Sequence, residues 1–305
     1  MTVTHMDGGI PHITVCICTF KRPQLLKRAL EETNRLETEG RFSYSLVVAD
    51  NDRLESARRL VEDFQRNAEV AIAYCVEPEQ NIALARNRAL KHATGEFIAF
   101  IDDDEFPQLD WLLTSFRACV ERNCDGVLGP VRPFFEQEPP EWLLRGKFCM
   151  RPEHATGTVL DWRQTRTGNA LFKTAMLEGV EEPFRRQFGN GGEDDDFFRR
   201  MMESGRVFIW CNEAVVSEVV PPERWTRGYM LKRALLRGQN QRAIADYRSI
   251  AKSAIAVPLY AILLPFLLML GQHVFMKYVI RLADHAGKLF AVLGWKPLGE
   301  KYLAT

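Results

Sequence analysis

Apolar segments that alternate with helical patterns constrain the fold of this chain more than any other feature. Strands are predicted at residues 13–20, 44–50, 70–76 and 96–101, which are short runs rich in β-branched side chains. Helices are predicted at residues 23–30, around 60–64 and at 82–93, where apolar residues recur with helical spacing. Strands joined by helices in this way form parallel βαβ units. The sequence therefore predicts an α/β fold with a mostly parallel, doubly wound sheet.

The pattern loosens after this alternation but stays consistent with one domain. Helices are predicted at 111–122 and 193–205, and a further strand at 207–211. Residues 130–152 are rich in proline and aromatic side chains, which predicts a loop-rich connection packed on a surface. We expect a catalytic domain over residues 1–225.

Charge and cysteine content exclude several classes of protein. The chain has 40 basic and 40 acidic residues, so no overall positive field would draw it to nucleic acid. Its seven cysteines lack the paired spacing of a zinc site, which favours free thiols in a reducing compartment. Residues 1–11 contain neither the basic nor the apolar segment of a secretory signal. We therefore expect a cytoplasm-facing protein without a nucleic-acid partner.

Residues 226–305 form a second region that is basic at first and then uncharged. Residues 226–252 contain seven basic side chains and one acidic side chain. Residues 253–276 contain no Asp, Glu, Lys or Arg, and this uncharged segment is long enough to cross a bilayer. Pro258 and Pro265 interrupt it. Because basic residues flank it on both sides, a re-entrant or interfacial helix pair fits better than one span, with a buried core helix as the alternative. The expected location is the cytoplasmic side of the cell membrane.

Two acidic clusters are the strongest candidates for chemistry. Four acids, residues 102–105, follow the predicted buried strand at 96–101, and four more, residues 193–196, begin the predicted helix after Gly191 and Gly192. Crowded carboxylates at the end of a strand repel one another unless a cation is present, and oxygen ligands suit Mg²⁺ or Mn²⁺. A carboxylate of the second cluster could take the proton from an attacking hydroxyl. Solvated acidic turns are the alternative interpretation of both clusters.

Six short motifs, taken together, resemble the glycosyltransferase family 2, and in particular its bacterial members that build exopolysaccharides and other surface glycans. They are residues 15–23 (VCICTFKRP), 47–51 (VVADN), 85–87 (ARN), 101–104 (IDDD), 167–169 (TGN) and 192–194 (GED). The resemblance extends from about residue 13 to residue 233. It implies the GT-A fold of nucleotide-diphospho-sugar transferases, with a helical, membrane-associating extension at the C-terminus.

The resemblance also implies roles for individual residues. The positions expected to bind the donor nucleotide are Thr19, Asp50, Arg86, Asp102 and Asp103, with Asp50 accepting from a uracil N–H. Those expected at the metal, catalytic and sugar or acceptor positions are Asp104, Asp194, Asn169 and Glu193. The family commonly has a metal-ligating histidine near residue 218, where this chain has Glu218. A glutamate can also bind a hard cation, so we expect Glu218 to complete the metal site, with Mg²⁺ somewhat favoured over Mn²⁺.

The implied activity is inverting transfer of a sugar from a nucleotide diphosphate, which we expect to be a UDP-sugar, to a hydroxyl of a glycan or polyprenyl-linked acceptor. A nucleotidyltransferase is the nearest enzymatic alternative, but it usually has a glycine-rich phosphate loop after the first strand, and residues 19–23 contain no glycine. A non-catalytic membrane adaptor that keeps the fold is the second alternative. Intact Asp104 and Asp194 argue against it, whereas the replacement of histidine by Glu218 argues mildly for it.

Overall fold

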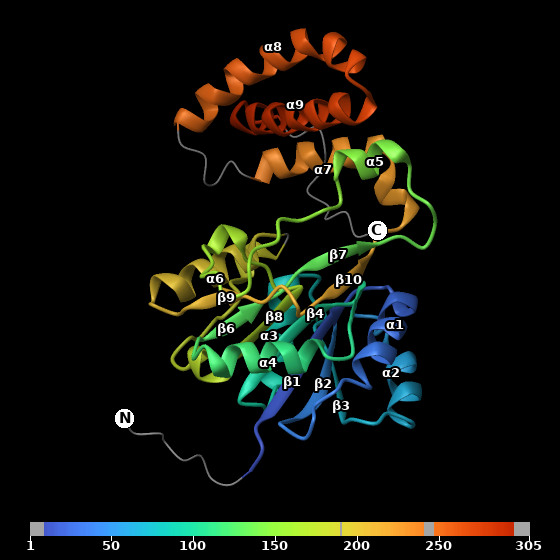
Figure 1. The fold of residues 1–305 in the computed structure, drawn as a ribbon, viewed down its shortest axis with the longest axis vertical. Helices are drawn as coiled ribbons and strands as arrows, with labels where there is room; N and C mark the ends of the chain where they lie inside the picture. The colour runs from blue at the N-terminus through green and yellow to red at the C-terminus, as the bar shows by residue number, and fades with distance from the viewer. Residues whose placement is uncertain (1–8, 190, 241–246, 296–305) are drawn as a thin grey trace. The chain divides into compact units, whose positions relative to one another are not determined.

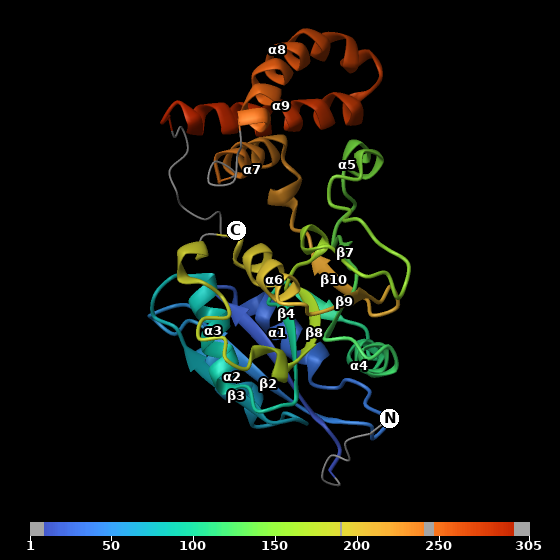
Figure 2. The same ribbon diagram turned by 90° about the vertical axis from the view of Figure 1, so that its left-hand side faces the viewer.

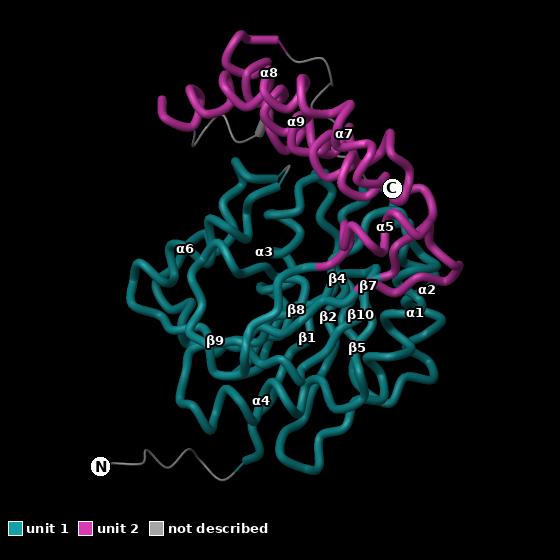
Figure 3. Tube along the Cα trace, turned by 45° about the horizontal axis from the view of Figure 1, so that its top comes forward, with its two compact units in different colours: residues 1–132, 151–218 teal, residues 133–150, 219–305 magenta. Residues whose placement is uncertain are grey.

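The computed structural model describes residues 9–189, 191–240 and 247–295. The chain divides into two compact units, shown in two colours in Figure 3. Unit 1 consists of residues 1–132 and 151–218, and unit 2 of residues 133–150 and 219–305. The second unit therefore includes an internal segment besides the C-terminal region.

A seven-stranded sheet forms the centre of unit 1, in the order β3-β2-β1-β4-β8-β6-β9 (Figure 1). Its strands are β1 (His12–Thr19), β2 (Ser43–Asp50), β3 (Ile72–Val76), β4 (Phe97–Asp102), β6 (Gly126–Leu128), β8 (Asn169–Lys173) and β9 (Phe208–Trp210). All neighbouring pairs are parallel except the two that involve β8. The mostly parallel sheet predicted from the alternating pattern is confirmed.

Helices cover both faces of this sheet (Figure 2). They are α1 (Pro23–Thr33), α2 (Arg58–Gln65), α3 (Ile82–His92), α4 (Trp111–Glu121) and α6 (Glu193–Glu203). Side chains of α1, α2 and α4 pack in one apolar cluster, and those of α3 and α6 pack in the other. Successive side chains of a strand point to opposite faces, so Val15 belongs to the first cluster and Cys16 to the second. Burial on both faces explains the continuous apolar runs, and the sheet is doubly wound as predicted.

A smaller sheet has the order β5-β10-β7. Its strands are β5 (Glu105–Pro107), β10 (Val216–Val219) and β7 (Val131–Phe134). The antiparallel pairing of β5 and β10 places Glu218 opposite Glu105. This pairing brings residue 218, which is distant in sequence, next to the first acidic cluster.

Sequence patterns missed several short elements. We predicted loops between residues 130 and 152, whereas the structure has β7 and the helix α5 (Glu141–Gly146) there. Pro133 lies within β7, which is tolerated because β7 is an edge strand of its sheet. The remaining one-turn helices are η1 (Trp162–Gln164), η2 (Thr174–Leu177), η3 (Arg186–Phe188) and η4 (Pro222–Trp225). Elements of three to five residues are too short to show a reliable period in sequence.

Unit 2 contains the helices α5, α7 (Arg227–Asn240), α8 (Tyr247–Met269) and α9 (Gln272–Val292). Among the described residues, α8 is the one helix long and apolar enough to cross a membrane. Only 11% of its apolar window is buried, which contradicts the alternative of a buried core helix. The uncharged segment 253–276 is divided between α8 and α9, and the location of this helix pair in a membrane stays a prediction.

Candidate active site

The end of β1 and the end of β4 form the centre of the candidate site. The two strands are parallel neighbours, with Cys18 paired to Asp102, so the residues that follow them meet at one edge of the sheet. Thr19 donates a hydrogen bond from Oγ1 to Oδ2 of Asp103, over 2.8 Å. Asp103 and Asp104 are both buried. The structure thus brings together Thr19 and the acidic cluster, as expected.

The guanidinium of Arg22, to which we assigned no role from the sequence, is a counter-charge for this cluster. Nη1 of Arg22 lies 3.1 Å from Oδ1 of Asp103 and 3.2 Å from Oδ2 of Asp104. Burial raises the pKa of Asp103 to about 7, although Arg22 and the Thr19 hydroxyl lower it. Arg22 belongs to the first of the six motifs, so its position in that motif was the signal that could have identified it.

Arg86 connects the two acidic clusters. It lies on α3, it is buried, and its Nη1 forms an ion pair with Oε1 of Glu193 at the start of α6. Its Nη2 lies 3.6 Å from Oδ1 of Asp102 at the end of β4. Burial lowers the pKa of Arg86, but the carboxylates of Glu193, Asp102 and Asp194 together raise it by more than burial lowers it. The guanidinium therefore remains charged. Residues from three elements therefore share one charged site.

The buried carboxyl of Glu193 is only partly compensated. Within the described part of the chain, its Oε2 has no hydrogen-bond partner. Burial raises the pKa of Glu193 against the opposing influence of Arg86. An incompletely satisfied buried oxygen next to the acidic cluster is typical of a site that receives a ligand.

The four acids at the start of α6 differ in their surroundings. Asp196 is buried among the guanidinium groups of Arg185, Arg199 and Arg200, at 3.5, 3.5 and 2.8 Å. Asp195 is exposed. Asp194 is half-buried, and its Oδ1 accepts a hydrogen bond from the backbone N–H of Asp195. No salt bridge to Asp194 occurs among the described residues. Of the four, Asp194 thus combines partial burial with an uncommitted charge.

A third guanidinium joins Glu218 to the first cluster. Arg151 forms an ion pair with Oε2 of Glu218, and its Nη1 lies 4.0 Å from Oε1 of Glu105. Oε2 of Glu105 accepts a hydrogen bond from the backbone N–H of Asp102 at 2.9 Å, and burial raises the pKa of Glu105 well above its usual value. The expected place of Glu218 beside the cluster is found, with Arg151 as a partner that sequence analysis missed.

Gly168 packs directly against these carboxylates. A Cβ at this position would lie 2.6 Å from Oε1 of Glu105 and 3.1 Å from Oδ2 of Asp102, so a side chain here would require these carboxylates to move. The middle residue of the motif at 167–169 therefore lies where two carboxylates approach the backbone closely. The motif alone gives no sign of this role for Gly168, because the two carboxylates belong to a different segment of the chain.

Two of the expected ligand-binding residues have internal partners. Asp50 is completely buried and accepts hydrogen bonds from the N–H groups of Asp52 and Ala57 and from the Tyr74 hydroxyl. It holds the loop after β2, where we expected a contact with uracil. The amide nitrogen of Asn169 donates to two backbone carbonyls, and its oxygen accepts from Trp111 Nε1. Both amide hydrogens of Asn169 are therefore already used within the core, where we expected a contact with sugar.

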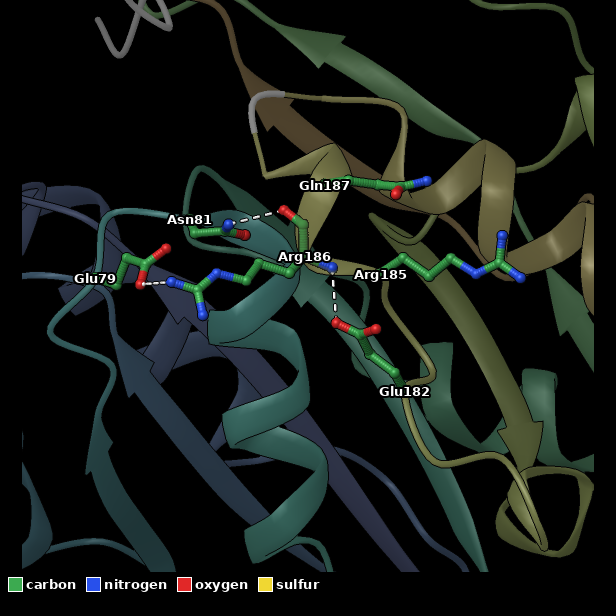
Figure 4. A pocket seen from close by; sticks show the side chains of 6 residues that line it. All are labelled: Glu79, Asn81, Glu182, Arg185, Arg186 and Gln187. Atoms are coloured by element: carbon green, nitrogen blue, oxygen red, sulfur yellow. Dashed lines mark hydrogen bonds and ion pairs between the residues drawn. The ribbon is translucent and has the colours of Figure 1, made fainter.

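An open pocket of about 690 Å³ lies beside the loop after β3 (Figure 4). Its lining residues are Glu79, Asn81, Glu182, Arg185, Arg186 and Gln187. Arg186 forms an ion pair with Glu79, and the Asn81 side chain donates to the carbonyl of Arg186, as the dashed lines show. Asn51, at the end of β2, donates to the carbonyls of Glu77 and Glu79. The pocket thus adjoins the loops that follow β2 and β3.

The first acidic cluster, residues 102–105, has the oxygen atoms that a divalent cation prefers as ligands. Among the described residues there is no group of three or more His, Cys, Asp or Glu side chains arranged to hold a metal. Mg²⁺ needs only one or two protein carboxylates when substrate phosphates supply other ligands. Oε1 of Glu105 is buried without a hydrogen-bond partner in the described residues, as expected near a cation. The described carboxylates therefore do not form a metal site by themselves, although their oxygen atoms are of the kind that a hard cation prefers.

Known proteins similar to this chain agree with the fold and with the motifs. The family "Glycosyl transferase family 2" matches residues 14–180. The chain is 32% identical to the succinoglycan biosynthesis protein ExoM of Rhizobium meliloti, over 97% of each protein.

Solved structures show the same architecture. The mannosyltransferase PcManGT of Pyrobaculum calidifontis, solved with GDP-Man and Mn²⁺, matches with a TM-score of 0.61 and 18% identity, over 93% of this chain and 88% of that one. S. aureus TarS residues 1–349, solved with UDP-GlcNAc, match with a TM-score of 0.52 and 14% identity, over 94% and 93%. These neighbours confirm the expected GT-A fold, and the sequence matches decide the family: the chain belongs to glycosyl transferase family 2.

Proposed function

We propose that this protein is an inverting glycosyltransferase that moves a sugar from a UDP-sugar to a hydroxyl of a glycan or polyprenyl-linked acceptor during synthesis of a surface polysaccharide. The observation that carries this proposal is the bridge made by Arg86 between Asp102 and Glu193. It joins the carboxylates suited to a donor diphosphate and its cation to the helix that carries the candidate base. The similarity to a succinoglycan biosynthesis protein supports the class of product.

In the proposed mechanism, residues at the ends of β1 and β4 bind the donor. Thr19, Asp102 and Asp103 hold the nucleoside part, and the guanidinium of Arg86 lies next to the diphosphate. Asp104, with Glu218 beside it, would hold a Mg²⁺ or Mn²⁺ ion, and that ion supplies neutralisation of the charge that develops on the leaving diphosphate. Arg22 compensates the crowded carboxylates and keeps them in place for this purpose.

The acceptor side of the reaction depends on Asp194. Its carboxylate takes the proton of the acceptor hydroxyl while the oxygen attacks the anomeric carbon. The bond from that carbon to the diphosphate oxygen breaks as the new glycosidic bond forms, so the configuration inverts in one displacement. Glu193 stays paired with Arg86 and fixes the first turn of α6, which orients Asp194.

Two features support the choice of donor. TarS has been solved with UDP-GlcNAc and PcManGT with GDP-Man, so nucleotide-sugar donors occur among proteins of this fold. In this chain the fully hydrogen-bonded Asp50 holds the loop after β2. We propose that this loop lies against the nucleotide base of the donor and that Asp50 holds the loop in position.

Release of nucleotide from a panel of nucleotide sugars tests the proposed function. Purified protein is incubated with each donor, an acceptor extract, and either Mg²⁺, Mn²⁺ or excess chelator, and free nucleoside diphosphate is measured. We expect turnover with a UDP-sugar and a divalent cation. Pyrophosphate release from a nucleoside triphosphate would instead support a nucleotidyltransferase, and no turnover with any donor would support a non-catalytic adaptor.

A further inference from the structure

The helix α8 has two apolar stripes, and one of them packs within unit 2. Ser253 and Ala256 are buried, and the Ser253 hydroxyl lies 2.9 Å from Nδ1 of His285 on α9. The ring of Tyr260 contacts the rings of Tyr278 and His285, with centroids 5.5 and 5.9 Å apart. Residues 253, 256 and 260 lie on one face of the helix, which therefore faces α9.

The second stripe is exposed along the length of α8. It consists of Ile255, Leu259, Ile262, Phe266 and Met269, which are between 49% and 85% exposed. Their spacing of three and four residues places them on one face. Residues 253–270 contain no charged side chain at all. Such a large, continuous apolar surface on a folded protein marks an interaction site.

The position of α9 argues against α8 as a membrane-spanning helix. At 23 residues, α8 is about 34 Å long, enough for one span. However, α9 packs along α8 on one side and along α7 on the other. It carries Lys277, Arg281, Asp284 and Lys288, and Asp284 is paired with Arg237 of α7 at 2.9 Å. A spanning α8 would draw these charges into hydrocarbon, where they are strongly disfavoured.

Two prolines leave backbone carbonyls of α8 without a helical hydrogen bond. Pro258 and Pro265 lie inside α8 and are exposed. A proline has no N–H, so the carbonyls four residues earlier, at Ala254 and Ala261, cannot receive a helical hydrogen bond. At a membrane interface, water and headgroups can donate to these carbonyls, so the two prolines are compatible with a helix that lies there.

The helices α8 and α9 carry an excess of basic side chains. Arg248 and Lys252 are exposed near the start of α8, and Lys277 and Arg281 are exposed on α9. Lys288 donates to the hydroxyl of Ser249 at 2.8 Å. Together α8 and α9 carry these five basic side chains and one acidic side chain, Asp284. The charge is complementary to anionic phospholipid headgroups.

We propose that α8 lies in the plane of an anionic membrane surface as a monotopic anchor. Its exposed stripe enters the apolar layer just below the headgroups, α9 separates it from α7, and neither α7 nor α9 enters the hydrocarbon. The occupant of the stripe is therefore one leaflet of a bilayer. This anchor goes beyond the proposed function, because it depends only on unit 2 and stands whether or not the enzyme transfers sugar.

Vesicle binding by the full-length protein tests the anchor. We expect binding to phosphatidylcholine vesicles that contain phosphatidylglycerol, and weaker binding to phosphatidylcholine alone. Ile262→Glu with Phe266→Glu should lower the partition coefficient at least about tenfold, since two large apolar side chains no longer enter the layer. Lys252→Ala with Arg281→Ala should lower it about fivefold per charge on the anionic vesicles only.

The matched control places a charge on an exposed apolar residue elsewhere. Leu54 is 81% exposed in unit 1, so Leu54→Glu should leave vesicle binding and the melting temperature unchanged. Equal binding of the double glutamate variant and the control would overturn the proposal. A stable dimer of the wild-type protein without lipid that loses its dimeric state in the double variant would also overturn it, because a second copy would then cover the stripe.

Accessibility at the two ends of α8 separates an in-plane helix from a span. In a Cys149→Ser background, Ile255→Cys and Met269→Cys are each labelled with a nitrobenzoxadiazole dye and bound to sealed vesicles. Cys149 is half-buried and the other six cysteines are buried, so labelling is confined to the introduced thiol. External dithionite should quench both dyes by more than about nine-tenths if α8 lies in the plane. Protection of one end would show a span and contradict the in-plane anchor.

Discussion

The two acidic clusters have almost the same composition, yet the fold uses them differently. After β4, three of the four acids are buried, and they share Arg22, Arg86 and Arg151 as counter-charges. At the start of α6, Asp194 and Asp195 remain accessible, and the two buried acids of that cluster are paired with arginines. Crowded carboxylates with guanidinium partners suit the binding of a ligand that brings its own cation, whereas an accessible carboxylate suits proton transfer. The comparison teaches that two clusters with the same acid content can differ in burial and pairing, and this difference is the basis of the separate roles proposed for them.

The largest expected effect tests the cation-binding cluster. Asp104→Asn removes one negative charge but keeps the shape, so the affinity for the divalent cation should fall and kcat/KM should drop by about 10³-fold. Titration of turnover with Mg²⁺ and Mn²⁺ measures it. Full turnover of the wild-type enzyme in excess chelator would contradict the assignment of this cluster.

The second effect tests the accessible carboxylate. Asp194→Asn should lower kcat by about 10²-fold or more and leave donor affinity within a few-fold, because the amide cannot accept the proton. Asp195→Asn is the matched control, one residue away and exposed, and should change kcat less than about threefold. If Asp195→Asn causes the larger loss, the base is the neighbouring residue.

Much of this arrangement was predictable because strand and helix periods are local properties. The four parallel strands, α3 and α6 follow from runs of five to eleven residues with a clear pattern, and the six motifs place both clusters at the ends of these elements. The short strands β5, β8 and β10 were not predicted, and with them the place of Glu105 opposite Glu218 was missed.

The counter-charges were harder to find for a physical reason. Arg22, Arg86 and Arg151 are three of 40 basic residues, and nothing in their local sequence shows which carboxylate each one meets. Their pairing depends on contacts between residues up to 107 positions apart, such as Arg151 with Glu218 and Arg86 with Glu193. Sequence identified Arg86 through its motif alone. The internal partners of Asp50 and Asn169 likewise depend on loops that have no period.

A third prediction separates structural from catalytic acids within the second cluster. Asp196 is buried among three arginines, so Asp196→Asn should lower the free energy of unfolding by about 1–2 kcal/mol through weaker charge-assisted hydrogen bonds. Urea denaturation measures this loss. Because the charged partners of Asp196 are Arg185, Arg199 and Arg200, kcat at a temperature where the variant is folded should stay within about twofold. A loss of kcat comparable to that of Asp194→Asn would show that the cluster acts as a unit.

The smallest expected effect concerns the backbone that aims Asp194. Gly192 precedes α6 with φ of +88°, a region that L side chains rarely adopt, and a Cβ at this position would meet only a Phe188 carbon, at 3.8 Å. Gly192→Ala should therefore cost about 1 kcal/mol of stability from backbone strain alone. Gly205, just beyond the other end of α6, has φ of +89° and open space, so Gly205→Ala should cost a similar amount.

The Gly192→Ala and Gly205→Ala variants have matched backbone strain but differ in their distance from Asp194. If the first turn of α6 orients Asp194, kcat should fall by about three- to tenfold for Gly192→Ala and remain unchanged for Gly205→Ala. Equal kcat values for the two variants, measured at equal stability, would mean that the position of Asp194 does not depend on this turn, and that the ion pair of Glu193 with Arg86 alone suffices to hold it.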